Sequence, residues 1–402
     1  MPGHLEQRSS KSWTIIIEAG RDPKTGKRKR IKKAFRGTKK AAEKEMARML
    51  YELEQGLFVE VSKLSFGDYL TMWLNEYARN KAPKTYLRYE EIILKSVIPE
   101  LGQIRIEKLK PLHLQSYYTK MLESGKKNGT GLSPTTVLQH HRIIHKALEM
   151  AIKWQIVPRN IADAVDPPKK FKSEITPLNE DQVRMMIKSA TSTVYYTQIV
   201  LAVLTGMRRG EIYGLRWQDI DSKNGTITIK QTAQYTPKDG IIYKEPKTSR
   251  SKRTIDVSDF VLDALKRQKV EQIKARLAMG KKYRNKENLV FTLADGKPQH
   301  PDSISTWFPE FMNKSKLPRI RYHDLRHTHA SLLLKGGESL KLICDRLGHS
   351  SIGITADTYT HLAPGMQKKA AANLEEKIFQ TESGTKRAPK TKKRPRAKPR
   401  KR

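Results

Sequence analysis

Hydrophobic residues change their spacing along the chain, and three short segments near its start have the composition of β-strands. These segments cover residues 3–8, 12–19 and 27–35. The last two are joined by Asp-Pro and a glycine, which is turn chemistry typical of a hairpin. Thr38 then takes the N-cap position of a helix that is expected to end at Gly56. The pattern predicts a small three-stranded sheet with one helix.

A second block, from Leu64 to about Ala164, has apolar residues at the three- and four-residue spacings of amphipathic helices. The apolar stripe of its first predicted helix consists of Phe66, Tyr69, Leu70, Trp73, Leu74 and Tyr77. Further helices are expected over residues 84–102, 110–124 and 133–154. Ser133 is placed as an N-cap, with Pro134 at the first helical position. This block predicts a compact all-α bundle.

Two adjacent prolines among mixed charges, within residues 163–178, mark a linker and place a domain boundary near residue 170. The block that follows reaches about residue 380, with helices at both ends and strands between them. The strands are expected at residues 225–230, 240–245 and 252–258. This mixture predicts a mainly helical α+β domain. The whole chain is therefore expected to be multidomain.

Charge changes the picture more than any other compositional property. Lys and Arg number 79 against 41 Asp and Glu, which gives a formal net charge of +38. Such a field favours a polyanionic partner, and nucleic acid is the commonest one. Residues 21–40 hold 11 basic side chains and one acid, Asp22. A solvated hairpin face is one interpretation of this cluster, and a sheet set in a DNA groove is the preferred one.

The end of the chain and its single cysteine add further limits. Residues 386–402 hold 11 Lys or Arg and no acid, so this tail is expected to be disordered in isolation and to contact phosphates. No apolar run approaches the roughly 18 residues of a membrane span, and the polar start lacks a secretory signal. Cys344 excludes an intramolecular disulfide, and its apolar neighbours indicate core packing. A reducing cytoplasm is the expected compartment, with no membrane partner.

Four short stretches of the third block carry polar residues in unusual density. Gly206 permits a sharp turn before Arg208, which falls at the start of a helix where backbone N–H groups also favour an anion. Glu211, one turn later, is placed to hold that arginine. Lys247 lies in the turn between two strands. The last two stretches supply His323, Arg326, His349 and Tyr359.

Together these residue types suit phosphodiester chemistry without a metal. The pentacoordinate transition state gains negative charge, which two arginines bind bidentately and histidines bind through N–H groups. A lysine protonates the departing 5′ oxygen as general acid. A tyrosine hydroxyl becomes a nucleophile when cations stabilise its phenolate. Taken singly, each residue also has a plain structural reading, as a surface ion pair, a solvated lysine or a half-buried aromatic ring.

A zinc site is the rival interpretation of the histidines, because His323 and His327 share a helix face. Asp324 and Arg326 stand between them, and an arginine repels a metal cation. A hydrolytic zinc site also needs a third ligand and a water-activating carboxylate. His327 and His329 are therefore expected to be helix-surface or packing residues. A solvated or phosphate-facing helix, without a metal, is likewise expected for His140, His141 and His145.

Five stretches, in this order, resemble the tyrosine recombinases of the phage integrase family: TGMRRGEIYGLRW, KTSRSKRTI, HDLRHTHAS, LGHSS and DTYTHL. The H-x-x-R box, the later L-G-H and the tyrosine in Y-x-H form a specific signature. The resemblance covers about residues 1–375. It implies an arm-type DNA-binding domain, a helical core-binding domain and a catalytic domain, which the basic tail follows. Their expected limits are 1–60, 61–168, 169–380 and 381–402.

Carried over residue by residue, the resemblance assigns six catalytic roles. Arg208 and Arg326 would bind the scissile phosphate, with His323 and His349 as hydrogen-bonding and acid–base partners. Lys247 would be the general acid. The nucleophile that forms a 3′-phosphotyrosyl bond would be Tyr359.

Two of these assignments have neighbouring alternatives. Arg209 adjoins Arg208, which is preferred because the family's arginine directly follows the T-G-x turn. Lys244 and Lys252 compete with Lys247 for the role of general acid.

The resemblance also implies partners and a reaction sequence. Family members act as homotetramers on double-stranded DNA, at core and arm-type sites, and exchange strands through a Holliday junction without ATP, metal or another cofactor. Residues 364–379 would dock on a neighbouring protomer, and an excisionase and a host DNA-bending protein are candidate partners. The expected protein is the integrase of a phage or conjugative element. Two alternatives are a non-catalytic DNA-binding regulator on the same scaffold, against which the filled catalytic positions argue, and a type IB topoisomerase.

Overall fold

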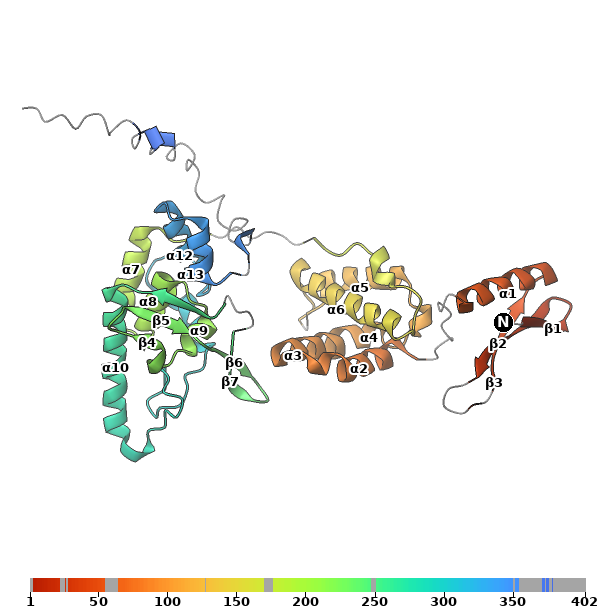
Figure 1. Ribbon diagram of the computed structural model, residues 1–402, viewed down its shortest axis with the longest axis horizontal. Helices are drawn as coiled ribbons and strands as arrows, with labels where there is room; N and C mark the ends of the chain where they lie inside the picture. The colour runs from red at the N-terminus through yellow and green to blue at the C-terminus, as the bar shows by residue number, and fades with distance from the viewer. Residues whose placement is uncertain are drawn as a thin grey trace, which may run out of the picture. The chain divides into compact units, whose positions relative to one another are not determined.

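The chain divides into two compact units, Met1–Ser173 and Glu174–Arg402, in a computed structural model (Figure 1). The structure describes residues 3–21, 26, 28–54, 64–126, 128–169, 176–246, 251–349, 351–353, 371, 372, 374, 375 and 378. The first unit contains a small sheet with its helix and a helical bundle, and the second contains helices and strands. The predicted multidomain fold class is confirmed. The predicted limits of the four segments stay a prediction.

The N-terminal sheet has three antiparallel strands in the order β1–β2–β3. Their bounds are Gly3–Ser9, Ser12–Arg21 and Arg28–Arg36. Helix α1, Lys39–Glu54, packs on one face of the sheet. Ile15 and Ile17 of β2 face this helix and contact the cluster around Met49, because alternate side chains of a strand point to the same side. The three predicted strands and the helix are all present.

The start of α1 follows the sequence prediction. Thr38 caps the helix, since its Oγ1 accepts a hydrogen bond from Ala41 N at 3.3 Å. The predicted end at Gly56 lies outside the described residues.

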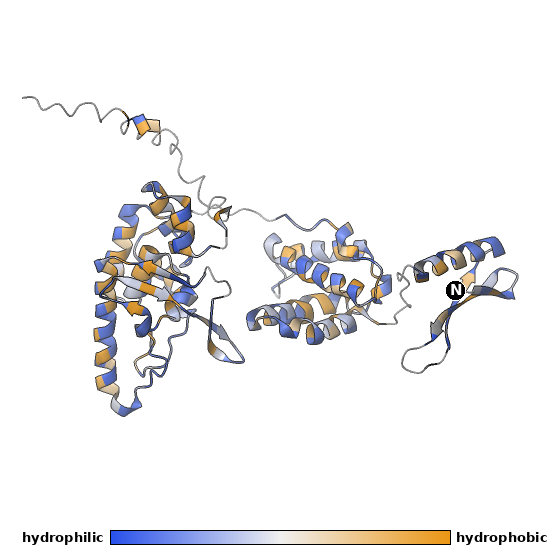
Figure 2. Ribbon diagram, viewed as in Figure 1, coloured by the Kyte–Doolittle hydropathy of each residue, from blue (hydrophilic) through white to orange (hydrophobic). Residues whose placement is uncertain are grey.

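The helical bundle of the first unit buries the apolar stripe predicted from the sequence. Its elements are α2 (Phe66–Glu76), η1 (Ala78–Asn80), α3 (Pro83–Ile92), η2 (Ile93–Val97), α4 (Ile98–Leu101), η3 (Ile106–Lys108), α5 (Pro111–Ser124), α6 (Pro134–Lys153) and η4 (Ile161–Ala164). Tyr69, Leu70 and Trp73 of α2 have no exposed surface. In Figure 2 the bundle helices are apolar on their inner faces and hydrophilic outside. Ser133 caps α6, accepting from Thr136 N at 3.2 Å.

The helix predicted over residues 84–102 is interrupted in its middle. Five residues, Ile93–Val97, form a π-helical turn between α3 and α4. Pro99 lies in the first turn of α4 and has no N–H to donate to the preceding turn, so the regular ladder cannot pass through it. The apolar spacing continued across this proline, which explains why the pattern predicted one helix.

The three histidines of α6 correct the prediction of a solvated or phosphate-facing surface. His140 is 2 % exposed, and its Nδ1 lies 2.8 Å from the Tyr117 hydroxyl of α5. The Nδ1 atom of His141 likewise lies 3.0 Å from the Tyr118 hydroxyl of α5. His145 has a carboxylate partner, since its Nε2 lies 2.7 Å from Asp163. Two of the histidines therefore join α5 to α6, and the third joins α6 to the chain that follows it.

We expect the stability of the first unit to fall as the pH is lowered from about 6.5 to about 4, the unfolded and folded pKa values of His140. Burial lowers the folded pKa, so within this window the unfolded chain binds a proton that the folded chain does not, and unfolding is favoured. The full difference corresponds to about 3 kcal/mol. Urea titrations across this range measure the free energy of unfolding at each pH. This free energy should depend less on pH in His140→Gln than in the unaltered chain, and the exposed His4→Gln serves as control. Equal profiles for both variants would contradict the assignment.

The second unit is a mainly helical domain around one large core. Its helices are α7 (Glu180–Ala190), α8 (Tyr196–Thr205), α9 (Arg209–Tyr213), η5 (Trp217–Asp219), α10 (Asp259–Met279), η7 (Gly280–Lys282), α11 (Ser303–Lys314), α12 (Asp324–Lys335) and α13 (Leu340–Leu347). Its strands are β4 (Ile220–Asp221), β5 (Thr226–Ile229), β6 (Thr232–Thr236), β7 (Gly240–Lys244) and β8 (Arg253–Asp256). Across the described ranges, no helix is long and apolar enough to cross a membrane.

The strands of this unit form two small antiparallel sheets. One has the order β4–β5–β8 and the other pairs β6 with β7. The three strands predicted from the sequence correspond to β5, β7 and β8. The polar strand β6, with the sequence TAQYT, was not predicted because it lacks an apolar run. The two sheets matter for the site because the chain between β7 and β8 contains Lys247.

Candidate active site

Arg208 is fixed by the turn that its sequence predicts. Gly206 ends α8 with a left-handed φ of 66°, and a Cβ there would lie 2.6 Å from Cδ2 of His329. Arg208 follows as the N-cap of α9. Its backbone N–H donates to Glu211 at 2.9 Å, and its guanidinium donates to the same carboxylate at 2.8 Å. Glu211 thus holds the arginine, as the spacing indicated.

Arg326 lies on α12 and is 3 % exposed. Its guanidinium donates to the carbonyl of Gly206 and to the carbonyl of Leu347, both at 2.6 Å. The first bond ties α12 to the turn that carries Arg208. The second ties it to the end of α13.

Three successive carbonyls at the end of α13 each accept a hydrogen bond from a different arginine. The Arg346 carbonyl accepts from Arg253 Nε at 2.7 Å, and the Leu347 carbonyl accepts from Arg326. The Gly348 carbonyl accepts from Arg208 at 3.0 Å. The last carbonyls of a helix have no partner within it and form the negative end of its dipole. We call Arg208, Arg253 and Arg326 the arginine network.

Glu211 joins two members of this network. It is 4 % exposed and accepts from Arg253 at 3.0 and 3.2 Å, in addition to Arg208. Burial alone would raise the pKa of Glu211, but the charges and hydrogen bonds of Arg253 and Arg208 outweigh burial and lower it. The carboxylate is therefore ionised at neutral pH.

His349 follows directly after this helix terminus. Gly348 ends α13 with a φ of 66°, and the His349 N–H donates to the Cys344 carbonyl at 3.1 Å. Burial, and then the charges of Arg326 and Arg208, lower the pKa of His349 to about 4. The imidazole is neutral at pH 7 and lies in the positive field of both candidate arginines.

His323 is the N-cap residue of α12 and is exposed at the surface. Desolvation of its ring, followed by the charges of His327, Arg326 and Arg208, lowers its pKa to about 4. His323 and His349 share Arg208 and Arg326 as charged neighbours, so four of the six predicted residues come together.

The other histidines of this stretch are not arranged for a metal. His329 is 5 % exposed, with Nδ1 2.9 Å from the Val203 carbonyl and Nε2 accepting from Arg346 at 3.2 Å. Its ring lies against Gly206, so it is a packing residue. His327 is half-buried, and its ring lies perpendicular to that of His323 at 5.7 Å. Among the described residues, no group of three or more His, Cys, Asp or Glu is placed to hold a metal ion.

Lys247 and Tyr359, the other two predicted catalytic residues, lie outside the described residues. The structure does describe Arg209, the alternative to Arg208, and Lys252, one of the alternatives to Lys247. Arg209 turns toward α11 and pairs with Asp302, away from the arginine network. Lys252 pairs with Glu245 at 2.7 Å.

Arg253, whose side chain is buried, and Arg346, which is half-buried, belong to this site but were not singled out from the sequence. Arg253 and the buried Ile255 are two residues apart on β8 and point to the same side of the strand, so the period-two pattern indicates its inward position but not its partners. Arg346 is half-buried, and its guanidinium donates to the Leu204 carbonyl at 3.3 Å as well as to His329. Buried cations of this kind are rare without partners.

Comparisons with known proteins match both units of the chain. Residues 176–366 match the "Phage integrase family" and residues 65–122 match the "Phage integrase, N-terminal SAM-like domain". The ICEBs1 integrase of Bacillus subtilis is 28% identical over 377 residues, which is 90% of this chain and 97% of the relative. A "Tyrosine recombinase XerC-like" protein of Caldanaerobacter subterraneus is 28% identical over 381 residues, covering 90% and 95%.

Solved structures show the same fold at lower identity. The Tn1549 transposon integrase in complex with transposon right end DNA has a TM-score of 0.64 at 23% identity, covering 79% of this chain and 100% of that chain. A lambda integrase tetramer bound to a Holliday junction has a TM-score of 0.54 at 18% identity, covering 88% and 94%.

The family whose models match both units consists of tyrosine recombinases, which cleave and religate DNA. The chain belongs to the phage integrase family of tyrosine recombinases, and its activity is site-specific recombination of a mobile element. The predicted family, enzyme class and function are thereby confirmed.

We expect Glu211→Gln to lower the stability of the second unit by about 3–5 kcal/mol, because it leaves the buried Arg253 without its carboxylate. The matched control is Glu310→Gln, which breaks an exposed pair with Lys314 and should cost far less stability, because solvent screens surface ion pairs. Urea titration of both variants measures the difference. A loss no larger than that of the control would contradict the role of Glu211 in holding the network.

Proposed function

We propose that Arg208 and Arg326 bind the scissile phosphate of a core site. The observation that carries this proposal is the end of α13, where adjacent carbonyls hold both guanidinium groups. Arg208 keeps 37 % of its side chain exposed, so its position is fixed while its surface is open to an anion. An arginine held in one orientation stabilises a transition state without reorganising at the moment of reaction.

His323 and His349 act beside the phosphate as neutral imidazoles. The charges of Arg208 and Arg326 help to lower both pKa values to about 4, below the pH of the cell. A neutral ring carries one N–H donor and one acceptor nitrogen. Each histidine can therefore donate to a nonbridging oxygen or accept a proton, and the single negative charge of an arriving phosphodiester would favour the protonated form.

Tyr359 is the nucleophile and Lys247 is the general acid. The Tyr359 hydroxyl gives its proton to one of the neutral histidines as its oxygen attacks phosphorus, the bond to the 5′ oxygen breaks, and Lys247 gives that oxygen a proton. The 3′-phosphotyrosyl bond conserves the energy of the broken linkage, and a 5′-hydroxyl from the partner strand reverses the step. No metal, nucleotide or other cofactor enters this sequence. A hollow of about 690 Å³, whose lining includes Lys230, Lys244 and Lys252, lies beside β7 and β8.

The N-terminal sheet is proposed as the arm-type DNA-binding domain. Its face opposite α1 presents Arg28, Lys32 and Arg36, none of which pairs with a carboxylate in the part of the chain that the structure describes. By contrast, Lys33 on the helix side pairs with Glu45 at 2.7 Å. Unpaired cations on the open face of a narrow sheet suit a DNA groove. The helical bundle is proposed as the core-binding domain.

The assembly is proposed to be a homotetramer on two duplexes, with core and arm-type sites in the DNA of a phage or conjugative element. Residues 364–379 would dock on a neighbouring protomer, and the tail from 381 to 402 would add contacts that do not depend on sequence. An excisionase or a host DNA-bending protein would set the direction of the reaction. The site of action is the cytoplasm, where that DNA lies.

We expect Tyr359→Phe to abolish covalent trapping on a nicked core-site duplex and to leave DNA binding within about twofold, because only the nucleophilic oxygen is removed. Denaturing gels detect the covalent complex, and fluorescence anisotropy measures binding. Trapping at the level of the unaltered chain would remove Tyr359 from the role of nucleophile.

We expect a chain lacking residues 1–60 to lose most integration between full attachment sites and to keep cleavage of a short core site. The reason is that the basic sheet would contact only the arm-type sites. Integration and cleavage are measured on the two substrates in parallel. Unchanged integration would refute the arm-type assignment, whereas equal loss of both activities would point to a role in folding.

A further inference from the structure

A groove of about 560 Å³ lies between the last turns of α10 and the chain that follows it. Four basic and two aromatic side chains line it, and its lining includes no acid: Lys269, Arg276, Arg284, Lys286, Trp217 and Tyr283. Lys269 and Arg276 are seven residues apart and therefore share one face of the helix. We call this the distal groove.

The four cations of the distal groove differ from other basic residues of α10. Lys266 pairs with Asp263 at 2.9 Å, and Lys274 pairs with Glu271 at 2.8 Å, both outside the groove. Within the described ranges, none of the four groove cations has a carboxylate partner. Four like charges around one hollow repel one another, so an anion bound there would be stabilised by all of them.

The aromatic part of the groove is held in place by hydrogen bonds. Trp217 donates through its indole N–H to Gln272 at 2.7 Å, and Gln272 in turn donates to Thr292 at 3.0 Å. The ammonium of Lys269 lies 5.6 Å from the centre of the Trp217 ring. The Tyr283 hydroxyl lies 3.4 Å from Thr292. The groove thus combines fixed rings with cations.

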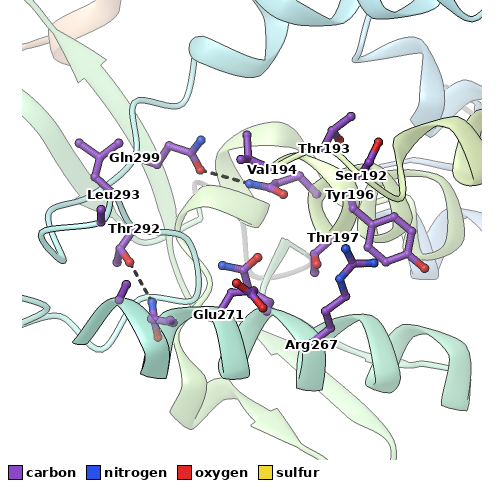
Figure 3. Close-up of a pocket in the computed structure, with 15 residues that line it drawn as sticks. Ser192, Thr193, Val194, Tyr196, Thr197, Arg267, Glu271, Thr292, Leu293 and Gln299 are labelled. Carbon is purple, nitrogen blue, oxygen red and sulfur yellow. Dashed lines mark hydrogen bonds between the residues drawn. The ribbon is translucent and has the colours of Figure 1, made fainter. Parts of the chain in front are cut away.

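A second hollow, between α8 and α10, gives a contrast, because its cation already has partners within the protein (Figure 3). Its volume is about 420 Å³, and its single arginine, Arg267, stacks on Tyr196 at 4.9 Å and donates to the Thr191 carbonyl at 2.7 Å. Glu271 also lines this hollow. Arg267 already has partners in this hollow, which also contains a carboxylate. The second hollow therefore offers no comparable site for an anion.

The distal groove is separate from the arginine network. None of the network residues lines it. In Figure 1 the end of α10 that leads to residue 280 lies at the opposite end of the second unit from α12 and α13. A ligand in this groove would therefore not occupy the place of the scissile phosphate.

We propose that the distal groove binds a single DNA strand, with phosphates against the four cations and a base against Trp217 or Tyr283. A positive groove with aromatic rings is the common arrangement for single-stranded nucleic acid, because every base has a face that can stack. A duplex hides those faces, and an acidic protein segment would not need two fixed rings. The enzyme would thus hold a strand away from the site of cleavage.

The test compares two double variants of the full chain that remove the same charge from α10. The groove variant is Lys269→Gln with Arg276→Gln, and the matched control is Lys266→Gln with Lys274→Gln. Anisotropy with labelled oligothymidylate is recorded over a range of NaCl concentrations. The groove variant should lower the slope of log affinity against log salt by about 1.4, since each phosphate contact on a single strand contributes about 0.7. The control should keep the slope of the unaltered chain.

Three results would overturn the proposal. Equal slopes for the two variants would show that the groove cations contact no phosphate. A reduced slope for a random-sequence duplex but not for oligothymidylate would assign the groove to double-stranded DNA. Lost binding of polyglutamate with an unchanged oligothymidylate slope would assign it to an acidic protein partner. Covalent trapping on a nicked core site, measured in parallel, should be equal in both variants and reports separately on the proposed catalytic residues.

Discussion

The terminus of α13 is the structural constraint on which the rest of the site depends. Its last carbonyls accept from arginines that come from three other elements: the turn before α9, strand β8 and helix α12. Charge-assisted hydrogen bonds of this kind are roughly twice as strong as neutral ones. They also fix direction, because a guanidinium is planar and rigid. The order of these carbonyls therefore sets the position of each arginine. His349 is placed beside them, because it directly follows Gly348.

The positive charges of the site are only partly neutralised by carboxylates. Glu211 is a single carboxylate that serves two guanidinium groups, Arg208 and Arg253. The remaining positive field helps to lower the pKa of His349, which a neutral environment would do only through burial. A site built in this way is stable enough to fold, yet its electrostatics favour an added anion. The same excess of positive charge thus favours binding of an anion at this site.

The sequence predicted the parts of this site whose signal is local. Gly206, Arg208 and Glu211 belong to one turn and its helix, so their spacing alone indicated how they meet. Arg253 was not found, because its partners lie some 40 and 90 residues away and include a backbone carbonyl that has no sequence signature. The histidines of α6 were misread for a related reason. Tyr117 and Tyr118 come from another helix, and only packing shows that they face His140 and His141.

Basic residues in this chain divide into those that hold the fold and those that face outward without a carboxylate. Arg253 is buried against Glu211 and a helix end, whereas Arg28, Lys32 and the cations of the distal groove have no such partner in the described ranges. Surface pairs contribute little to stability, so leaving these cations unpaired costs the fold little. Any contact that these cations made with DNA would depend on the salt concentration. An excess of +38 distributed over separate surfaces therefore favours an enzyme that contacts DNA at several places at once.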